Sequence, residues 1–117
     1  MTSKEMADKI AEIMDDRKAK NIEVIDTTKL TDITDYFIIC SGTSTTHVKG
    51  IADEIEFKMG EAGVECKHSE GYDSASWILL DFVDVVAHVF LQEEREFYNL
   101  ERLWKDSAGK IEANVEG

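Results

Sequence analysis

The sequence contains no proline, only two cysteines and no long apolar run. Cys40 and Cys66 form neither a CxxC motif nor a disulfide framework, which fits a reducing compartment. No stretch approaches the ~20 apolar residues of a membrane span, and the N-terminus lacks the apolar core of a signal peptide. We therefore expect a cytoplasmic protein that is not held in a membrane.

Positive charge is also scarce. Lysine and arginine number 13 against 25 aspartates and glutamates, so the net charge is −12. Affinity for nucleic acid depends on cationic side chains that displace counterions, so we expect no direct nucleic-acid binding of consequence. A basic protein is the partner that this charge favours.

The composition is that of an ordinary globular domain. The 117 residues are 43% hydrophobic and 32% charged, enough for one modest core. We expect a single domain over residues 1–107 and a frayed C-terminal tail over 108–117.

Hydrophobic periodicity predicts three helices and about five strands. Helical stripes lie in residues 3–19, in the segment that ends at Gly63, and in residues 93–106. The expected strands are 21–26, 35–40, a weaker 64–70, and the two halves of a hairpin within 76–90. The order αββαβββα predicts an α/β single domain with a mixed β-sheet.

The turn Ser41–Thr46 joins a strand to a helix, where backbone N–H groups can hold a phosphate. It lacks both GxGxxG and the GK[ST] of a P-loop, which favours a plain capped helix start. Nucleotidyl transfer would also need paired carboxylates for magnesium, and no Asp-x-Asp follows Ser41 and Gly42. A nucleotide-binding enzyme of this type remains the alternative hypothesis.

The sequence shows no pattern typical of a metal or cofactor site. The three histidines lie on different expected elements, without the spacing of metal ligands. We predict no metal, no cofactor and no enzymatic activity.

The segment "SWILLDFVDVVAHVF" (76–90) reads as a hairpin whose aliphatic run is interrupted by polar and aromatic side chains. A loop at Phe82–Val83 would place Asp81 opposite Asp84 and Trp77 opposite His88. One face would then be pure core, comprising Ile78, Leu80, Val85, Ala87, Val89 and Leu91. The other would carry Trp77, Leu79, Asp81, Asp84, Val86, His88 and Phe90.

This mixed face admits two interpretations. Like charges opposite one another destabilise a hairpin, so Asp81 and Asp84 indicate a cationic partner beside an aromatic anchor. Alternatively, Trp77 and His88 hydrogen-bond to each other within a second core.

Three segments in order, "DYFIICSGTSTTHVKGIAD", "EGYDSASWILLDFVDVVAHVF" and "REFYNLERLW", closely resemble the ribosomal silencing factor family (RsfS, also called Iojap-like). The resemblance runs from about Ile22 to Asp106. It implies a nucleotidyltransferase-like fold without the catalytic carboxylates. It also implies binding to the large ribosomal subunit through ribosomal protein L-fourteen, which blocks joining of the small subunit and represses translation, and a role in large-subunit maturation.

With this resemblance, the mixed face becomes a candidate surface for the ribosomal protein. Trp77, Leu79 and His88 would make the apolar contact, and Asp81 and Asp84 would pair with basic groups. Tyr72 and Tyr98 are expected at its rim, and Phe57 is a candidate for a homodimer contact.

This chain departs from the family pattern in the hairpin. Val83 stands where the family usually has glycine, and Ala87 where it has a third valine. Because valine disfavours positive φ, we expect a turn that differs from the family's and a register that can shift by one residue.

Overall fold

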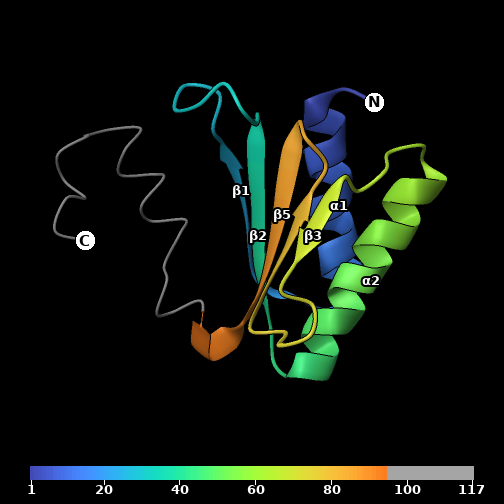
Figure 1. The fold of residues 1–117 in the computed structure, drawn as a ribbon, viewed down its shortest axis with the longest axis vertical. Coiled ribbons are helices and arrows are strands. Elements are labelled where there is room, and N and C mark those ends of the chain that lie inside the picture. The colour runs from blue at the N-terminus through green and yellow to red at the C-terminus, as the bar shows by residue number, and fades with distance from the viewer. Residues whose placement is uncertain (95–117) are drawn as a thin grey trace, which may run out of the picture.

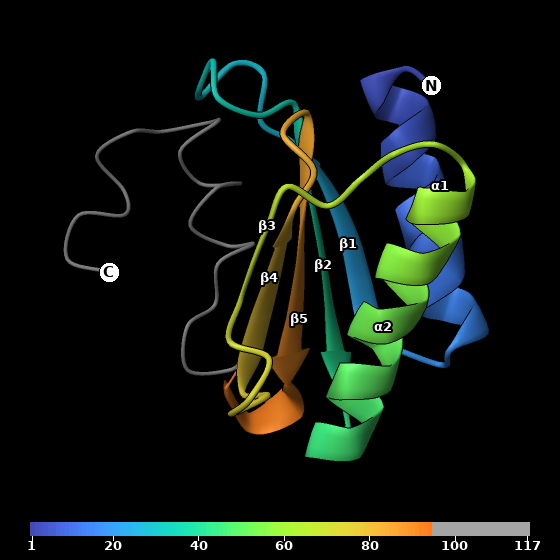
Figure 2. The ribbon, with the colours of Figure 1, turned by 45° about the vertical axis from the view of Figure 1, so that its right-hand side comes forward.

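The computed structural model describes residues 1–94, in which a five-stranded sheet carries two helices on one face (Figure 1, Figure 2). The helices are α1 (Ser3–Asp16) and α2 (Thr45–Glu61). The strands are β1 (Lys20–Asp26), β2 (Tyr36–Gly42), β3 (His68–Glu70), β4 (Trp77–Asp81) and β5 (Val85–Leu91). Tyr98, nearly all of the expected last helix and the expected tail lie outside the described residues.

The strand order is β1-β2-β5-β4-β3, with β2 and β5 parallel and the other pairs antiparallel. The expected α/β class and mixed sheet are confirmed. The last of the described strands, β5, therefore lies in the middle of the sheet. Strands with neighbours on both edges and layers on both faces are continuously apolar, as the buried run in β2 is.

Both described helices form in the segments where periodicity predicted them, and the second has the cap that was expected. The side chain of Thr2 accepts the Glu5 N–H and the Glu5 carboxylate accepts the Thr2 N–H, a capping box that starts α1. Ser44 caps α2 with a single hydrogen bond, in which its side chain accepts the His47 N–H. The buried stripe of α1 is Met6, Ala7, Ile10, Ile13 and Met14.

Two expected elements are shorter than predicted. The first helix ends at Asp16 instead of residue 19, and Lys18 takes a φ of +62°, which breaks the helix. The weak strand 64–70 shrinks to His68–Glu70. Val64, the first residue of the expected strand, instead takes part in the C-terminal cap of α2. Its N–H donates to the Met59 carbonyl at 2.8 Å, and Gly63 before it has a φ of +88°.

The sheet has an apolar layer on each face. The larger core lies between the sheet and the two helices and includes Ile38, Ile78 and Leu80. The smaller cluster lies on the opposite face, where Ile25, Ile39 and Phe90 are buried and Phe37 and Trp77 pack beside them. Neither described helix has the length and apolar character needed to cross a membrane.

Candidate partner-binding surface

The β4–β5 hairpin has the expected faces but a different register. Its partners are Trp77 with Phe90, Leu79 with His88 and Asp81 with Val86, so the register is two residues from the expected one. A shift of two preserves the side-chain alternation, because successive residues point to opposite faces. Leu80 thus lies in the helix-covered core and Trp77 on the opposite face, as the sequence predicted.

The predicted pairing of Asp81 with Asp84 is wrong, because Asp81 pairs with Val86. The loop consists of Val83 and Asp84, because the Phe82 N–H donates to the Val85 carbonyl at 2.9 Å. Val83 adopts a φ of +77°, the conformation that its β-branched side chain was expected to avoid. The Asp81 carboxylate accepts the Val83 N–H at 2.7 Å and so supports this turn. Cross-strand repulsion therefore gives no reason to expect a cationic partner here.

Trp77 and His88 form the centre of the face opposite the helices. The indole Nε1–H donates to His88 Nδ1 at 3.0 Å, and the indole stacks on the Phe90 ring with centroids 4.9 Å apart. The Phe37 ring meets His88 edge-on at 4.7 Å. Trp77 is thus held in a defined orientation, and part of its side chain is still exposed to solvent.

His88 is buried, with 4% of its surface exposed, so it supports Trp77 more than it offers surface itself. Because Nδ1 accepts from Trp77, the neutral ring carries its proton on Nε2, which has no acceptor in the described part of the chain. Burial lowers the pKa of His88 from 6.5 to about 4, since the charged ring would lose its hydration. The hydrogen bond expected between Trp77 and His88 is confirmed, and the indole is still partly accessible, so its part in binding a partner stays a prediction.

Acid should destabilise the fold through His88. The unfolded chain binds this proton near pH 6.5 and the folded chain near pH 4, so the stabilisation is complete above the first value and is lost as pH falls toward the second. Linkage gives a loss of about 2 kcal/mol between pH 7.5 and pH 5. Urea unfolding at both pH values measures it. His88→Asn keeps an acceptor for the indole but cannot titrate, so it should lose clearly less; an equal loss in both proteins would contradict this role.

The remaining expected contacts are not all on this face. Leu79 is half-buried opposite His88, and Asp81 lies at the end of the same strand. Tyr72 instead turns toward the helices, where its hydroxyl donates to Asp53 Oδ2 of α2 at 3.1 Å. The Asp53 carboxylate raises the pKa of Tyr72, since the hydrogen bond favours the protonated phenol.

Phe57, 62% exposed on α2, lies on the helical layer, and its part in a homodimer stays a prediction.

Gly71 is a positioning residue that the sequence analysis missed. It has a φ of +84°, and a Cβ built on it would lie 2.1 Å from the carbonyl oxygen of Trp77. The loop backbone therefore runs directly against the first residue of β4. The signal in the sequence was the "EGYDSAS" segment, whose glycine falls just before the hairpin.

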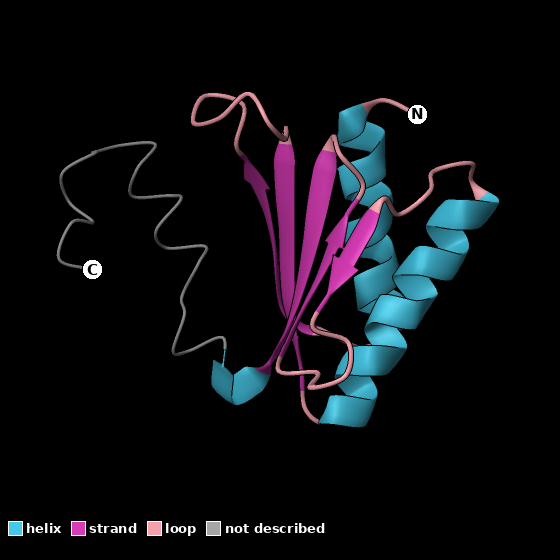
Figure 3. Cartoon of the chain, in the orientation of Figure 1, coloured by secondary structure: helices cyan, strands magenta, loops and turns pink. Residues whose placement is uncertain are grey.

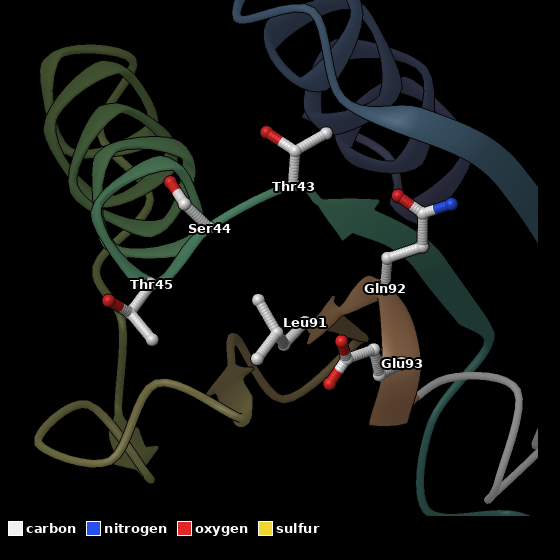
Figure 4. A pocket seen from close by; sticks show the side chains of 6 residues that line it. All are labelled: Thr43, Ser44, Thr45, Leu91, Gln92 and Glu93. Carbon is white, nitrogen blue, oxygen red and sulfur yellow. The ribbon is translucent and has the colours of Figure 1, made fainter.

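A cavity of about 420 Å³ lies where β2 and β5 end and α2 begins (Figure 4). Its lining residues are Thr43, Ser44, Thr45, Leu91, Gln92 and Glu93. Two N–H groups of the turn are already used, because Thr43 donates to His47 Nδ1 and His47 donates to Ser44. Among residues 1–94, the lining also supplies a carboxylate and no lysine or arginine, a chemistry that disfavours phosphate.

Among residues 1–94, no group of three or more histidine, cysteine or acidic side chains is placed to hold a metal ion.

Comparison with known proteins gives one consistent result. Residues 1–116 match the family model described as "Ribosomal silencing factor during starvation". The chain is 42% identical to the ribosomal silencing factor RsfS of Bacillus subtilis, over 92% of this chain and 91% of that one. It is also 35% identical to the mouse protein named "Mitochondrial assembly of ribosomal large subunit protein 1", covering 83% of this chain and 44% of the mouse protein.

Solved structures agree with the sequence comparison. A crystal structure from Chromobacterium violaceum superposes with a TM-score of 0.87 at 39% identity, covering 90% of this chain and 88% of the other. A second, from Bacillus halodurans, gives a TM-score of 0.74 at 41% identity, with coverages of 82% and 90%.

Proposed function

Because the chain belongs to the ribosomal silencing factor family, we propose that it binds the large ribosomal subunit in the cytoplasm and represses translation by blocking the joining of the small subunit. The docking partner in this proposal is ribosomal protein L-fourteen. A contribution to large-subunit maturation is part of the proposal and is supported by the name of the mouse relative.

The observation that carries the proposal is the state of Trp77. The indole is half-buried, fixed by the hydrogen bond to His88 and by the stack on Phe90. A large aromatic side chain that is already immobilised loses little conformational entropy on binding, which is how interface anchors gain affinity. Leu79 and Asp81 lie on the same strand face and extend the contact.

Net charge supports a protein partner over RNA. At −12, the chain is repelled by ribosomal RNA phosphates and attracted to a basic ribosomal protein. We therefore propose a protein–protein contact in which salt affects the association rate more than the final affinity.

Steric occlusion needs no catalysis, so we propose that the protein is not an enzyme. The chemistry of the Thr43–Thr45 cavity supports this view over the nucleotide-binding alternative, because the described residues that line it offer a carboxylate and no cation. A rise in melting temperature with a magnesium nucleotide would favour the alternative, since a ligand specific for the folded state stabilises it.

Sedimentation with separated subunits tests the proposal. The chain should pellet with large subunits and not with small ones, and it should lower the yield of joined ribosomes when small subunits are added afterwards. Protein-free ribosomal RNA is the control and should bind weakly at moderate salt. Tight binding to that RNA, or no binding to large subunits, would refute the proposal.

A further inference from the structure

Two chain segments far apart in sequence are joined at one end of the sheet. The β1–β2 loop and the β4–β5 turn both lie at the end opposite the Thr43–Thr45 cavity (Figure 3). The carbonyl oxygen of Asp84 accepts the Asp35 N–H at 2.8 Å and the Thr34 hydroxyl at 3.0 Å. Thr34 is buried and Asp84 is exposed, so the link is partly shielded from water. We call residues 26–35 together with 81–84 the apex.

The apex presents two exposed aliphatic side chains. Ile33 is 84% exposed and Val83 is 50% exposed, and each is one residue from the bond that joins Thr34 to Asp84. Neither is needed for the core. Burying such side chains against a partner would remove apolar surface from water, which favours association.

Val83 is held outward in a costly conformation. Its φ of +77° accompanies a hydrogen bond from the Asp84 N–H to the Phe82 carbonyl at 3.0 Å, so the turn closes over a single residue. Left-handed backbone costs a non-glycine residue roughly 1–2 kcal/mol, and a β-branched side chain suits it poorly. A glycine would take the same φ without this cost. Folding therefore gives no reason for a valine here.

The charge of the apex indicates which class of partner binds there. The apex contains five aspartates and one lysine, namely Asp26, Asp32, Asp35, Asp81, Asp84 and Lys29. An RNA strand would meet like charge, and so would the apex of a second copy of this chain. A protein surface with lysine or arginine around an apolar spot meets charge and shape together.

We propose that the apex is a second contact of the silencing surface, in which Ile33 and Val83 pack on the basic protein partner of the large subunit and the surrounding aspartates pair with its cations. This inference rests on the proposed function and deepens it. The β1–β2 loop leans away from the helical layer, toward the face that carries Trp77, so one partner can reach both (Figure 2).

Two valine-to-alanine substitutions test the proposed apolar contact. Val83→Ala truncates the side chain at the turn, and Val24→Ala is the control, a valine of similar exposure (43%) on β1, outside the apex. Val83→Ala combined with Ile33→Ala should weaken binding to isolated large subunits at least about tenfold. Val24→Ala should bind like the parent. Val83→Gly separates stability from binding. It should raise the melting temperature by removing the backbone strain, and it should still bind the large subunit more weakly than the parent.

A charge-reversal pair tests the electrostatic part. Asp84→Lys and Asp16→Lys change the net charge equally, but Asp16 lies exposed at the end of α1. Only Asp84→Lys should slow association with the large subunit. If all apex variants bind like the parent while Trp77→Ala does not, this inference is overturned and the proposed function stands. If the parent chain itself fails to bind large subunits, both fall together.

Discussion

Replacing Trp77 with alanine is expected to weaken binding to the large subunit by about thirtyfold or more. Truncating a central aromatic anchor commonly costs ~2 kcal/mol or more of binding free energy, and each 1.4 kcal/mol is about tenfold. Sedimentation or optical binding with purified large subunits measures the change. The variant must be assayed below its own melting temperature, because the stack on Phe90 and the bond to His88 are lost as well.

Leu80→Ala is the matched control on the other face of the same strand. Leu80 is 1% exposed in the helix-covered core, so its truncation should lower the free energy of unfolding by about 2–5 kcal/mol. The folded fraction should bind the large subunit as the parent does. If Trp77→Ala lost only stability, or Leu80→Ala lost affinity while folded, the surface around Trp77 would be structural and the silencing contact would lie elsewhere.

Gly71→Ala should have the largest effect on stability, a loss of at least about 3 kcal/mol in the free energy of unfolding. The added Cβ would lie 2.1 Å from the Trp77 carbonyl oxygen, and this atom belongs to the backbone of β4 and cannot rotate away. The φ of +84° adds strain of its own. Urea unfolding measures the loss in the free energy of unfolding. A displaced Trp77 indole should also change the tryptophan fluorescence of the folded state.

Gly60→Ala gives the opposite sign with the same chemical change. Gly60 lies within α2, and a Cβ there meets nothing within 4 Å. Alanine is favoured over glycine by roughly 0.5–1 kcal/mol in a helix interior, so this variant, one residue from the end of α2, should be more stable than the parent by at most that amount. Equal effects at the two positions would show that the contact with β4 does not constrain the loop.

The sequence predicted those parts of the hairpin that depend on local periodicity. Alternation with a period of two placed Leu80 in the core and Trp77 on the other face, whatever the register. The register itself was wrong, because the loop was expected at Phe82–Val83 and lies at Val83–Asp84, where Val83 takes a positive φ. Turn geometry, unlike face, depends on hydrogen bonds such as that from Val83 to Asp81, which no periodicity encodes.

The site was harder to predict because neighbours from distant segments define it. His88 was expected at the surface, yet β5 lies between β2 and β4, so Phe37 of β2 packs against its ring. Tyr72 was expected beside the same face because it precedes β4 closely in sequence. The loop carries it instead toward Asp53 of α2. Contacts with segments distant in sequence thus decided the surroundings of both residues.

The position of β5 also has a consequence for how the protein is made. Tyr36 of β2 pairs with Val85 of β5, and α2, β3 and β4 are all synthesised between them. While a ribosome is still extending the chain, β2 and β4 each have an edge with no neighbour, and such edges can pair with other chains. The sheet closes only after Leu91 has left the exit tunnel. The two ladders that β5 makes, with β2 and with β4, can therefore form only late, and pairing of strands so far apart in sequence slows folding.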